Sequence, residues 1–175
     1  ARSYFEMTGY NLEEERMAVV IQELVGSVHG DYYYPHVSGV AQSYNYYPIS
    51  YSKPEDGLCV SALGLGTWVV GGGAAYRFSP RYPKLDLVPA DQSLDNTQRS
   101  FHALDLRRST PELLAGEMAS LAELPLQAAS KDKKFPYLVS TWDAQDLRFV
   151  PGDSGKGTKI VDLANILKHD ALPFA

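Results

Sequence analysis

The stretch QRSFHALDL, residues 98–106, alternates apolar and polar side chains over most of its length. Successive side chains of an extended chain point to opposite sides, so Phe101, Ala103 and Asp105 share one face. A period of two predicts a β-strand here. Further strands are predicted earlier in the chain and again after residue 134.

Other short apolar runs are typical of strands. Residues 17–26, MAVVIQELVG, form a continuous, β-branched run that is closed by glycine and is too short for a typical helix, which predicts a buried strand. Residues 57–66, GLCVSALGLG, predict another, and we expect TWVVGGG (67–73) to continue it after a bend. A strand over about 135–141 would pair with one around 146–150.

Tyrosines crowd the interval around SGVAQSYN, residues 38–45, where they alternate with glycine, proline and serine. This pattern predicts a hairpin with wide aromatic contacts between its strands. The tyrosines concerned are Tyr32, Tyr33, Tyr34, Tyr44, Tyr46, Tyr47 and Tyr51.

One helix is predicted, over residues 111–124. Ser109 and Glu112 have the spacing of a capping box, and Pro125 ends the helix. Its apolar stripe consists of Leu114, Met118 and Leu121. Residues 160–167, IVDLANIL, fit a helix or a strand. The predicted fold class is therefore α+β: strand-rich, with a mostly antiparallel sheet and few helices, in a single domain over residues 1–175.

Composition and charge limit the classes of function. The formal net charge of −5 provides no broad basic face, which argues against nucleic-acid binding. No apolar run approaches the roughly 18–20 residues that span a bilayer, so we expect no membrane segment. Cys59 is the only cysteine, and it lies in an apolar run that favours an inert core position. A single cysteine and no secretory signal at the start fit a reducing, cytoplasmic location.

Two glycine-rich stretches suggest phosphate loops but lack the full motifs. Gly64-Leu65-Gly66 has no third glycine, and the strand-like residues that follow it favour a β-bulge or a bend. PGDSGKGTK, residues 151–159, looks like a Walker A loop, but Thr158 and Lys159 stand in the reversed order. We therefore expect a flexible surface loop at residues 151–159.

Titratable residues also form two weak candidate sites. His29, Asp31 and His36 do not have the spacing of a helical zinc motif or a zinc finger, so edge histidines of a hairpin are favoured over a metal site. The second candidate is a pair of carboxylates for general acid and base catalysis, drawn from Asp143, Asp146 and Asp153. However, DAQD (143–146) is also typical of an ordinary turn. We assign no catalytic residue and no metal ligand.

Three stretches in this order resemble the nucleotide-binding domain of the phosphoenolpyruvate synthase and pyruvate phosphate dikinase family, which has an ATP-grasp fold. They are MAVVIQELV (17–25), SGVAQSYN (38–45) and GLGTWVVGGG (64–73). FPYLVSTWDAQD (135–146) and TKIVDLANILK (158–168) look like a bacterial subgroup of the same family. The resemblance implies a partial ATP-grasp subdomain.

The resemblance implies an adenine-binding role for the end of the first stretch. Gln22, Glu23, Leu24 and Val25 would offer backbone N–H and C=O groups to the base, with Glu23 as a ribose acceptor. Thr67 stands where the family has glutamate, and Gln42-Ser43-Tyr44 replaces Phe-Thr-Arg. Charged roles at these two places are therefore in doubt. The alternative for residues 22–25 is a plain buried strand.

As the resemblance implies it, the parent protein transfers a phosphoryl group from ATP to a histidine and then to pyruvate. ATP and Mg²⁺ are the expected cofactors, and the Mg²⁺ ligands are expected outside this sequence. Partners would be the missing ATP-grasp lobe and the phosphohistidine domain, and the chain would be inactive alone and open to self-association. The alternative function is a non-catalytic interaction module that presents the tyrosine-rich hairpin.

Overall fold

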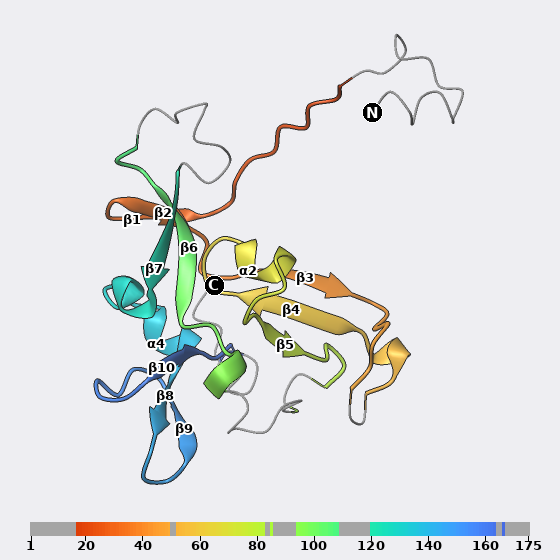
Figure 1. The fold of residues 1–175 in the computed structure, drawn as a ribbon, viewed down its shortest axis with the longest axis vertical. Helices are drawn as coiled ribbons and strands as arrows, with labels where there is room; N and C mark the ends of the chain where they lie inside the picture. Colours follow the sequence, from red (N-terminus) through yellow and green to blue (C-terminus); the bar gives the residue numbers. More distant parts are fainter. Residues whose placement is uncertain are drawn as a thin grey trace, which may run out of the picture.

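A computed structural model of the chain describes residues 17–49, 52–82, 85, 94–108, 120–163 and 166. The described part is built from short antiparallel strands in three small sheets, joined by short helical turns (Figure 1). This arrangement confirms the predicted strand-rich α+β class. No helix among the described residues is both long and apolar enough to cross a membrane.

The first sheet has the strand order β1-β2-β6-β7. Its strands are β1 (Ser27–His29), β2 (Tyr32–Tyr34), β6 (Ser100–Asp105) and β7 (Leu121–Pro125). Strand β6 confirms the alternation in the sequence, because Phe101, Ala103 and Asp105 are all buried on one face.

Strand β7 corrects the predicted helix. Residues 111–119 lie outside the described residues, but Leu121 and Leu124, which were expected in the last helical turn, belong to a strand. Phe101 on β6 is opposite Leu124, and Leu104 is opposite Leu121. Pairing with a neighbouring strand overrides the local helical pattern here.

The second sheet has the order β3-β4-β5. It contains β3 (Ser38–Gln42), β4 (Leu58–Ala62) and β5 (Tyr76–Phe78), and η2 (Pro54–Asp56) lies in the β3–β4 connection. Gly39 of β3 faces β4 so closely that a Cβ there would lie 2.8 Å from the carbonyl oxygen of Val60. Strand β4 lies within residues 57–66 and confirms the strand predicted there.

The expected continuation of β4 is wrong, because TWVV forms helix α2 (Thr67–Val70). Val70 N–H donates to the Gly66 carbonyl at 3.1 Å, and Gly71 N–H donates to the Thr67 carbonyl at 2.9 Å. These bonds within one turn satisfy the backbone without a partner strand. A short apolar run does not by itself distinguish the two structures.

The third sheet has the order β10-β8-β9. It is made of β8 (Val139–Asp143), β9 (Arg148–Pro151) and β10 (Lys159–Val161). The β8–β9 hairpin confirms the predicted pair, although β8 starts later because α4 (Phe135–Leu138) precedes it. The start of IVDLANIL is a strand, while residues 164, 165 and 167 lie outside the described residues.

Residues 17–26 differ most from expectation. They form no strand or helix and run away from the sheets to the grey N-terminal trace (Figure 1). Met17 is 95% exposed and Ile21 is 91% exposed, so the predicted buried strand is wrong. The apolar run has no neighbouring strand among the described residues, and a strand requires one.

The core lies where the three sheets meet. Its fully buried large side chains include Phe101, Phe135, Leu63, Leu126, Leu138, Val139 and Val161. Gln98, which is 1% exposed, donates from Nε2 to the Leu63 carbonyl at 2.8 Å and accepts at Oε1 from Leu63 N–H at 2.9 Å. Its own carbonyl accepts from Val161 N–H at 3.0 Å.

Candidate functional site

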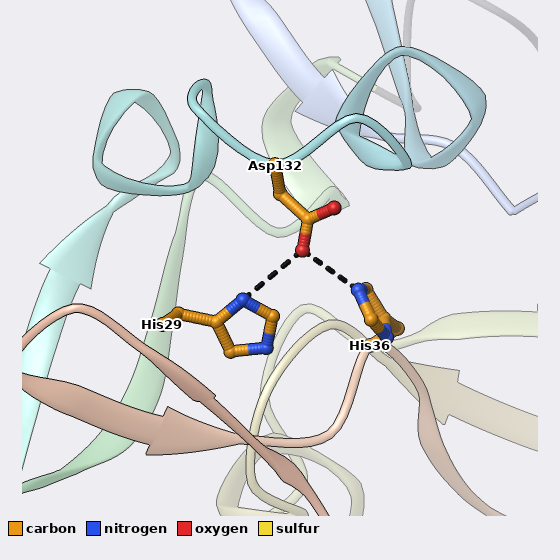
Figure 2. A group of neighbouring side chains, drawn as sticks. All are labelled: His29, His36 and Asp132. Carbon is orange, nitrogen blue, oxygen red and sulfur yellow. Dashed lines mark hydrogen bonds and ion pairs between the residues drawn. The ribbon is translucent and has the colours of Figure 1, made fainter.

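Two histidines and one aspartate converge between the first sheet and the loop that follows η3 (Leu126–Ala129). Asp132 Oδ2 lies 3.1 Å from His29 Nδ1 and 2.7 Å from His36 Nε2 (Figure 2). The side chains are 14–20% exposed, so the group is partly shielded from water. His29 and His36 come from the β1–β2 region, and Asp132 comes from about 100 residues further along the chain.

The surrounding structure fixes these side chains. The ring of His29 stacks on Tyr34, with centroids 4.1 Å apart and an interplanar angle of 20°. Tyr34 in turn packs against Phe101 in the core, with centroids 4.8 Å apart. The other carboxylate oxygen of Asp132 accepts from the Lys134 backbone N–H at 2.9 Å. The group is thus held by the sheet on one side and by a tight turn on the other.

Electrostatics follow from this burial. The pKa of His29 is lowered, because the effect of burial exceeds the opposite effect of the nearby Asp132 carboxylate. Burial also opposes ionisation of Asp132, but the Lys134 backbone N–H and His36 together lower the pKa of that carboxyl. Burial and then Asp132 raise the pKa of Tyr34 to about 12. At neutral pH the group therefore combines an ionised carboxylate with a neutral His29 imidazole and a neutral phenol.

The sequence pattern identified two of the three members. His29 and His36 come together as neighbours, with ring centroids 5.2 Å apart, but Asp31 is not part of the group. Asp132 takes that place. Its only local signal was the charged turn KDKK, residues 131–134, whose single acidic residue faces inward here.

Residues 22–25 lie on the exposed segment that leads into β1. Gln22, Glu23, Leu24 and Val25 are all exposed, and no backbone hydrogen bond between described residues involves residues 17–25. A side-chain hydrogen bond connects the segment to the first sheet, because Tyr33 Oη donates to the Leu24 carbonyl at 2.8 Å. Apart from the Leu24 carbonyl, the backbone N–H and C=O groups of residues 22–25 make no hydrogen bond within the described residues.

The opening glycines of GLGTWVVGGG permit a close approach of two backbones. Leu65 N–H donates to the His102 carbonyl at 2.8 Å, and Gly64 has φ +80°. A Cβ at Gly64 would lie 2.6 Å from the same oxygen. This glycine therefore serves packing between β4 and β6. Thr67 is the first residue of α2 and is half-buried.

The remaining carboxylate candidates occupy turns. Asp143 accepts from Gln145 N–H at 2.9 Å, and Asp146 pairs with Arg148 at 2.9 Å, so DAQD is a turn that closes the β8–β9 hairpin. Asp153 lies in the glycine-rich loop 3.2 Å from Lys159 Nζ. The pKa of Asp153 is lowered, mainly because its carboxylate accepts a hydrogen bond from the Gly155 backbone N–H. Burial opposes this shift, and Lys159 adds to it.

Cys59 faces a cavity of about 520 Å³ with an apolar lining. The cavity wall includes Val37, Phe78, Leu163 and Ile166, and it also includes His36 of the histidine–aspartate group. Burial raises the pKa of the Cys59 thiol. A thiol with a raised pKa is a poor nucleophile at neutral pH, in agreement with the inert role expected from the sequence.

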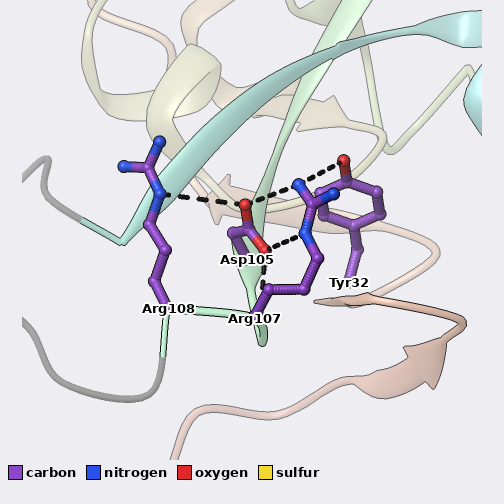
Figure 3. Close-up of polar contacts among 4 residues, drawn as sticks. All are labelled: Tyr32, Asp105, Arg107 and Arg108. Atoms are coloured by element: carbon purple, nitrogen blue, oxygen red, sulfur yellow. Dashed lines mark hydrogen bonds and ion pairs between the residues drawn. The ribbon is translucent and has the colours of Figure 1, made fainter.

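A second polar group lies at the end of β6, at Asp105 (Figure 3). Arg107 donates to both carboxylate oxygens at 2.8 Å, and Arg108 Nε lies 3.8 Å away. Arg107 also donates to Tyr32 Oη at 3.1 Å. Hydrogen bonding from Arg107 is the main reason that the pKa of Asp105 is about 2. This group joins β2 and β6, where Tyr32 and Asp105 are opposite in register.

The tyrosines do not form one hairpin surface. Tyr32, Tyr33 and Tyr34 lie on β2 of the β1–β2 hairpin, and Tyr34 is in the core. Tyr44, Tyr46 and Tyr47 lie in the β3–β4 connection instead, and Tyr51 lies outside the described residues. Tyr46 and Tyr47 are 73% and 87% exposed. Among the described residues, these two tyrosine rings are the most exposed.

Comparison with known proteins gives the family. Residues 1–106, more than half of the chain, match the family described as pyruvate phosphate dikinase, AMP/ATP-binding domain. The chain belongs to this family. No curated protein and no solved structure matches it. The pyruvate phosphate dikinase domain match runs through β6, so it includes residues 22–25, His29 and His36, but it ends before Asp132.

Proposed function

We propose that this chain supplies the adenine-side edge of the ATP site of a phosphoenolpyruvate-synthase-like phosphotransferase. The family match supports nucleotide binding. The observation that carries the proposal is the exposed segment 22–25, whose backbone N–H and C=O groups make no backbone hydrogen bonds within the described residues. Gln22, Glu23, Leu24 and Val25 bind the adenine edge and the ribose, with the Leu24 side chain, 46% exposed, against the base.

In this proposal the residues of the chain bind and orient the nucleotide. ATP supplies the phosphoryl group that a histidine of the parent enzyme receives and passes to pyruvate. Mg²⁺, whose ligands are expected outside this sequence, would neutralise charge on the phosphates when bound. The chain alone has no phosphotransfer activity, because the phosphohistidine domain and the other lobe of the ATP site are expected outside it.

The test is calorimetric titration of the full-length protein with ATP and Mg²⁺. Gln22→Pro and Leu24→Pro each remove one backbone N–H from the proposed edge, and the matched control is Val19→Pro, which lies on the same exposed segment and is 78% exposed. Loss of one backbone hydrogen bond weakens binding by about three- to tenfold. We expect this loss for at least one of the two variants and none for the control.

A second function is favoured by Tyr46 and Tyr47. Their exposed rings in the β3–β4 connection would present an aromatic patch to a partner domain, in a protein that has lost catalysis. The same titration separates the two functions. If the full-length protein binds no nucleotide at millimolar ATP, the phosphotransferase proposal fails and the interaction role remains.

A further inference from the structure

The histidine–aspartate group has the donor set of a transition-metal site. His29 Nδ1, His36 Nε2 and Asp132 Oδ2 all lie within 4.8 Å of one another. Two imidazole nitrogens and one carboxylate oxygen are ligands that Zn²⁺ and related ions prefer. Exposed acidic clusters often gather by chance, but this group contains a single acid, and its members are 14–20% exposed.

The geometry is close to what an ion would need. Tetrahedral Zn²⁺ with bonds of about 2.0–2.2 Å holds its ligand atoms about 3.4 Å apart. The present separations are 3.1 Å and 2.7 Å, because both rings contact the same oxygen directly. Each ring-to-oxygen separation would have to widen by about 0.3–0.7 Å to reach that value, and the turn that carries Asp132 lies at the surface of the fold.

The ligands are also held in place before any ion binds. Stacking on Tyr34 fixes the ring of His29, and the Lys134 backbone N–H holds the second oxygen of Asp132. His29 Nε2 is buried without a hydrogen-bond partner within the described residues, so the stacking on Tyr34 and the Nδ1 contact with Asp132 orient the ring. Supporting contacts of this kind orient metal ligands in known sites.

We propose that His29, His36 and Asp132 bind one divalent transition-metal ion of the Zn²⁺ class, through Nδ1, Nε2 and Oδ2 respectively. Three protein ligands leave one coordination position for water. The ion joins the part of the chain that matches the pyruvate phosphate dikinase domain to the region after residue 106, since only Asp132 lies beyond the match. This site is separate from residues 22–25 and does not depend on the ATP proposal.

The site is tested with the full chain after removal of metal by chelator. Calorimetric titration with Zn²⁺ should give one site per chain, and Co²⁺ should give the visible absorption bands of a four-coordinate ion. We expect His36→Ala and Asp132→Ala to weaken Zn²⁺ binding by at least about 100-fold. The matched control, His102→Gln, changes a histidine on β6 outside the group and should bind as the original chain does.

Folding of the variants is checked by circular dichroism. If Asp132→Ala does not fold, Asp132→Asn keeps the side-chain shape, and its Zn²⁺ affinity replaces the missing value. The original chain also gives a direct readout, because Zn²⁺ should shift the imidazole nitrogen signals of His29 and His36 in nuclear magnetic resonance spectra. Absence of those shifts and of the Co²⁺ bands overturns the proposal, as does equal Zn²⁺ affinity in His36→Ala and the control.

Discussion

At the scale of single residues, the Asp105 carboxylate helps to connect strands β6 and β2 through Arg107. It ends β6, accepts two hydrogen bonds from the Arg107 side chain and lies opposite Tyr32 on β2. The Asp105 side chain is 6% exposed while that of Arg107 is 58% exposed, so the pair reaches from the sheet to the surface. Its ionised form is the one that holds these contacts together.

Acid should therefore weaken the fold through Asp105. The hydrogen bonds from Arg107 lower its pKa from 3.8 to about 2, so the unfolded chain takes up this proton before the folded chain does. The contribution to stability is complete above about pH 4 and is lost as the pH falls toward 2. Urea unfolding between pH 5 and pH 2 should show this loss in the original chain.

Asp105→Asn should be less stable than the original chain at pH 6, and the difference should shrink as the pH approaches 2. Asp146→Asn is the control, because Asp146 is 55% exposed and pairs with the exposed Arg148. A constant difference between Asp105→Asn and the original chain across this range would contradict the account.

Only part of the histidine–aspartate group could be predicted from the sequence. His29 and His36 stand seven residues apart, and their proximity could be suspected from the sequence. Asp132 is separated from His36 by 96 residues, and only the pairing of β7 with β6 brings its turn to the hairpin. No local pattern encodes a contact that depends on the order of strands in a sheet.

At the scale of elements, alternation predicted well, whereas short apolar runs predicted a strand correctly at β4 but not at TWVV or at residues 17–26. Strand β6 follows the period of two in its sequence, and the β8–β9 hairpin lies where a turn separates two apolar stretches. TWVV and residues 17–26 are equally apolar, yet one is helix α2 and the other has no regular structure. Whether an apolar run forms a strand depends on a partner elsewhere in the chain.

The glycine bend after β4 gives a prediction for these elements. Gly64 and Gly72 both have positive φ, at +80° and +73°, but a Cβ at Gly72 would meet nothing within 4 Å. Gly72→Ala should cost about 1 kcal/mol from backbone strain alone. Gly64→Ala should cost about 1–3 kcal/mol more, because its Cβ would collide with the His102 carbonyl and the Phe101 ring.

Urea unfolding of both alanine variants measures the two costs, with Gly72→Ala serving as the control for backbone conformation. Equal losses of stability would mean that β4 and β6 do not approach closely at Gly64.

At the scale of the whole molecule, the contrast between residues 17–25 and the sheets predicts amide hydrogen exchange. The backbone of residues 17–25 makes no backbone hydrogen bonds within the described residues, so its amides should exchange at nearly unprotected rates. Amides of β6, which is paired on both sides, should exchange far more slowly. In the full-length protein, ATP with Mg²⁺ should slow exchange at residues 22–25 specifically.

Slowing at residues 22–25 without change at residues 17–19 would locate the nucleotide. Slow exchange at residues 17–25 in the absence of nucleotide would contradict the exposed conformation of this segment.

Gln98 has a consequence for the molecule as a whole. Its side chain holds the end of the second sheet at Leu63, its carbonyl holds Val161 of the third sheet, and its own segment leads directly into β6 of the first. Small sheets of short strands need a hydrophobic face packed against other elements to be stable. Because the buried residue Gln98 contacts or leads into all three sheets, they should unfold cooperatively. A substitution that destabilises any one sheet would therefore lower the abundance of the whole protein in the cell.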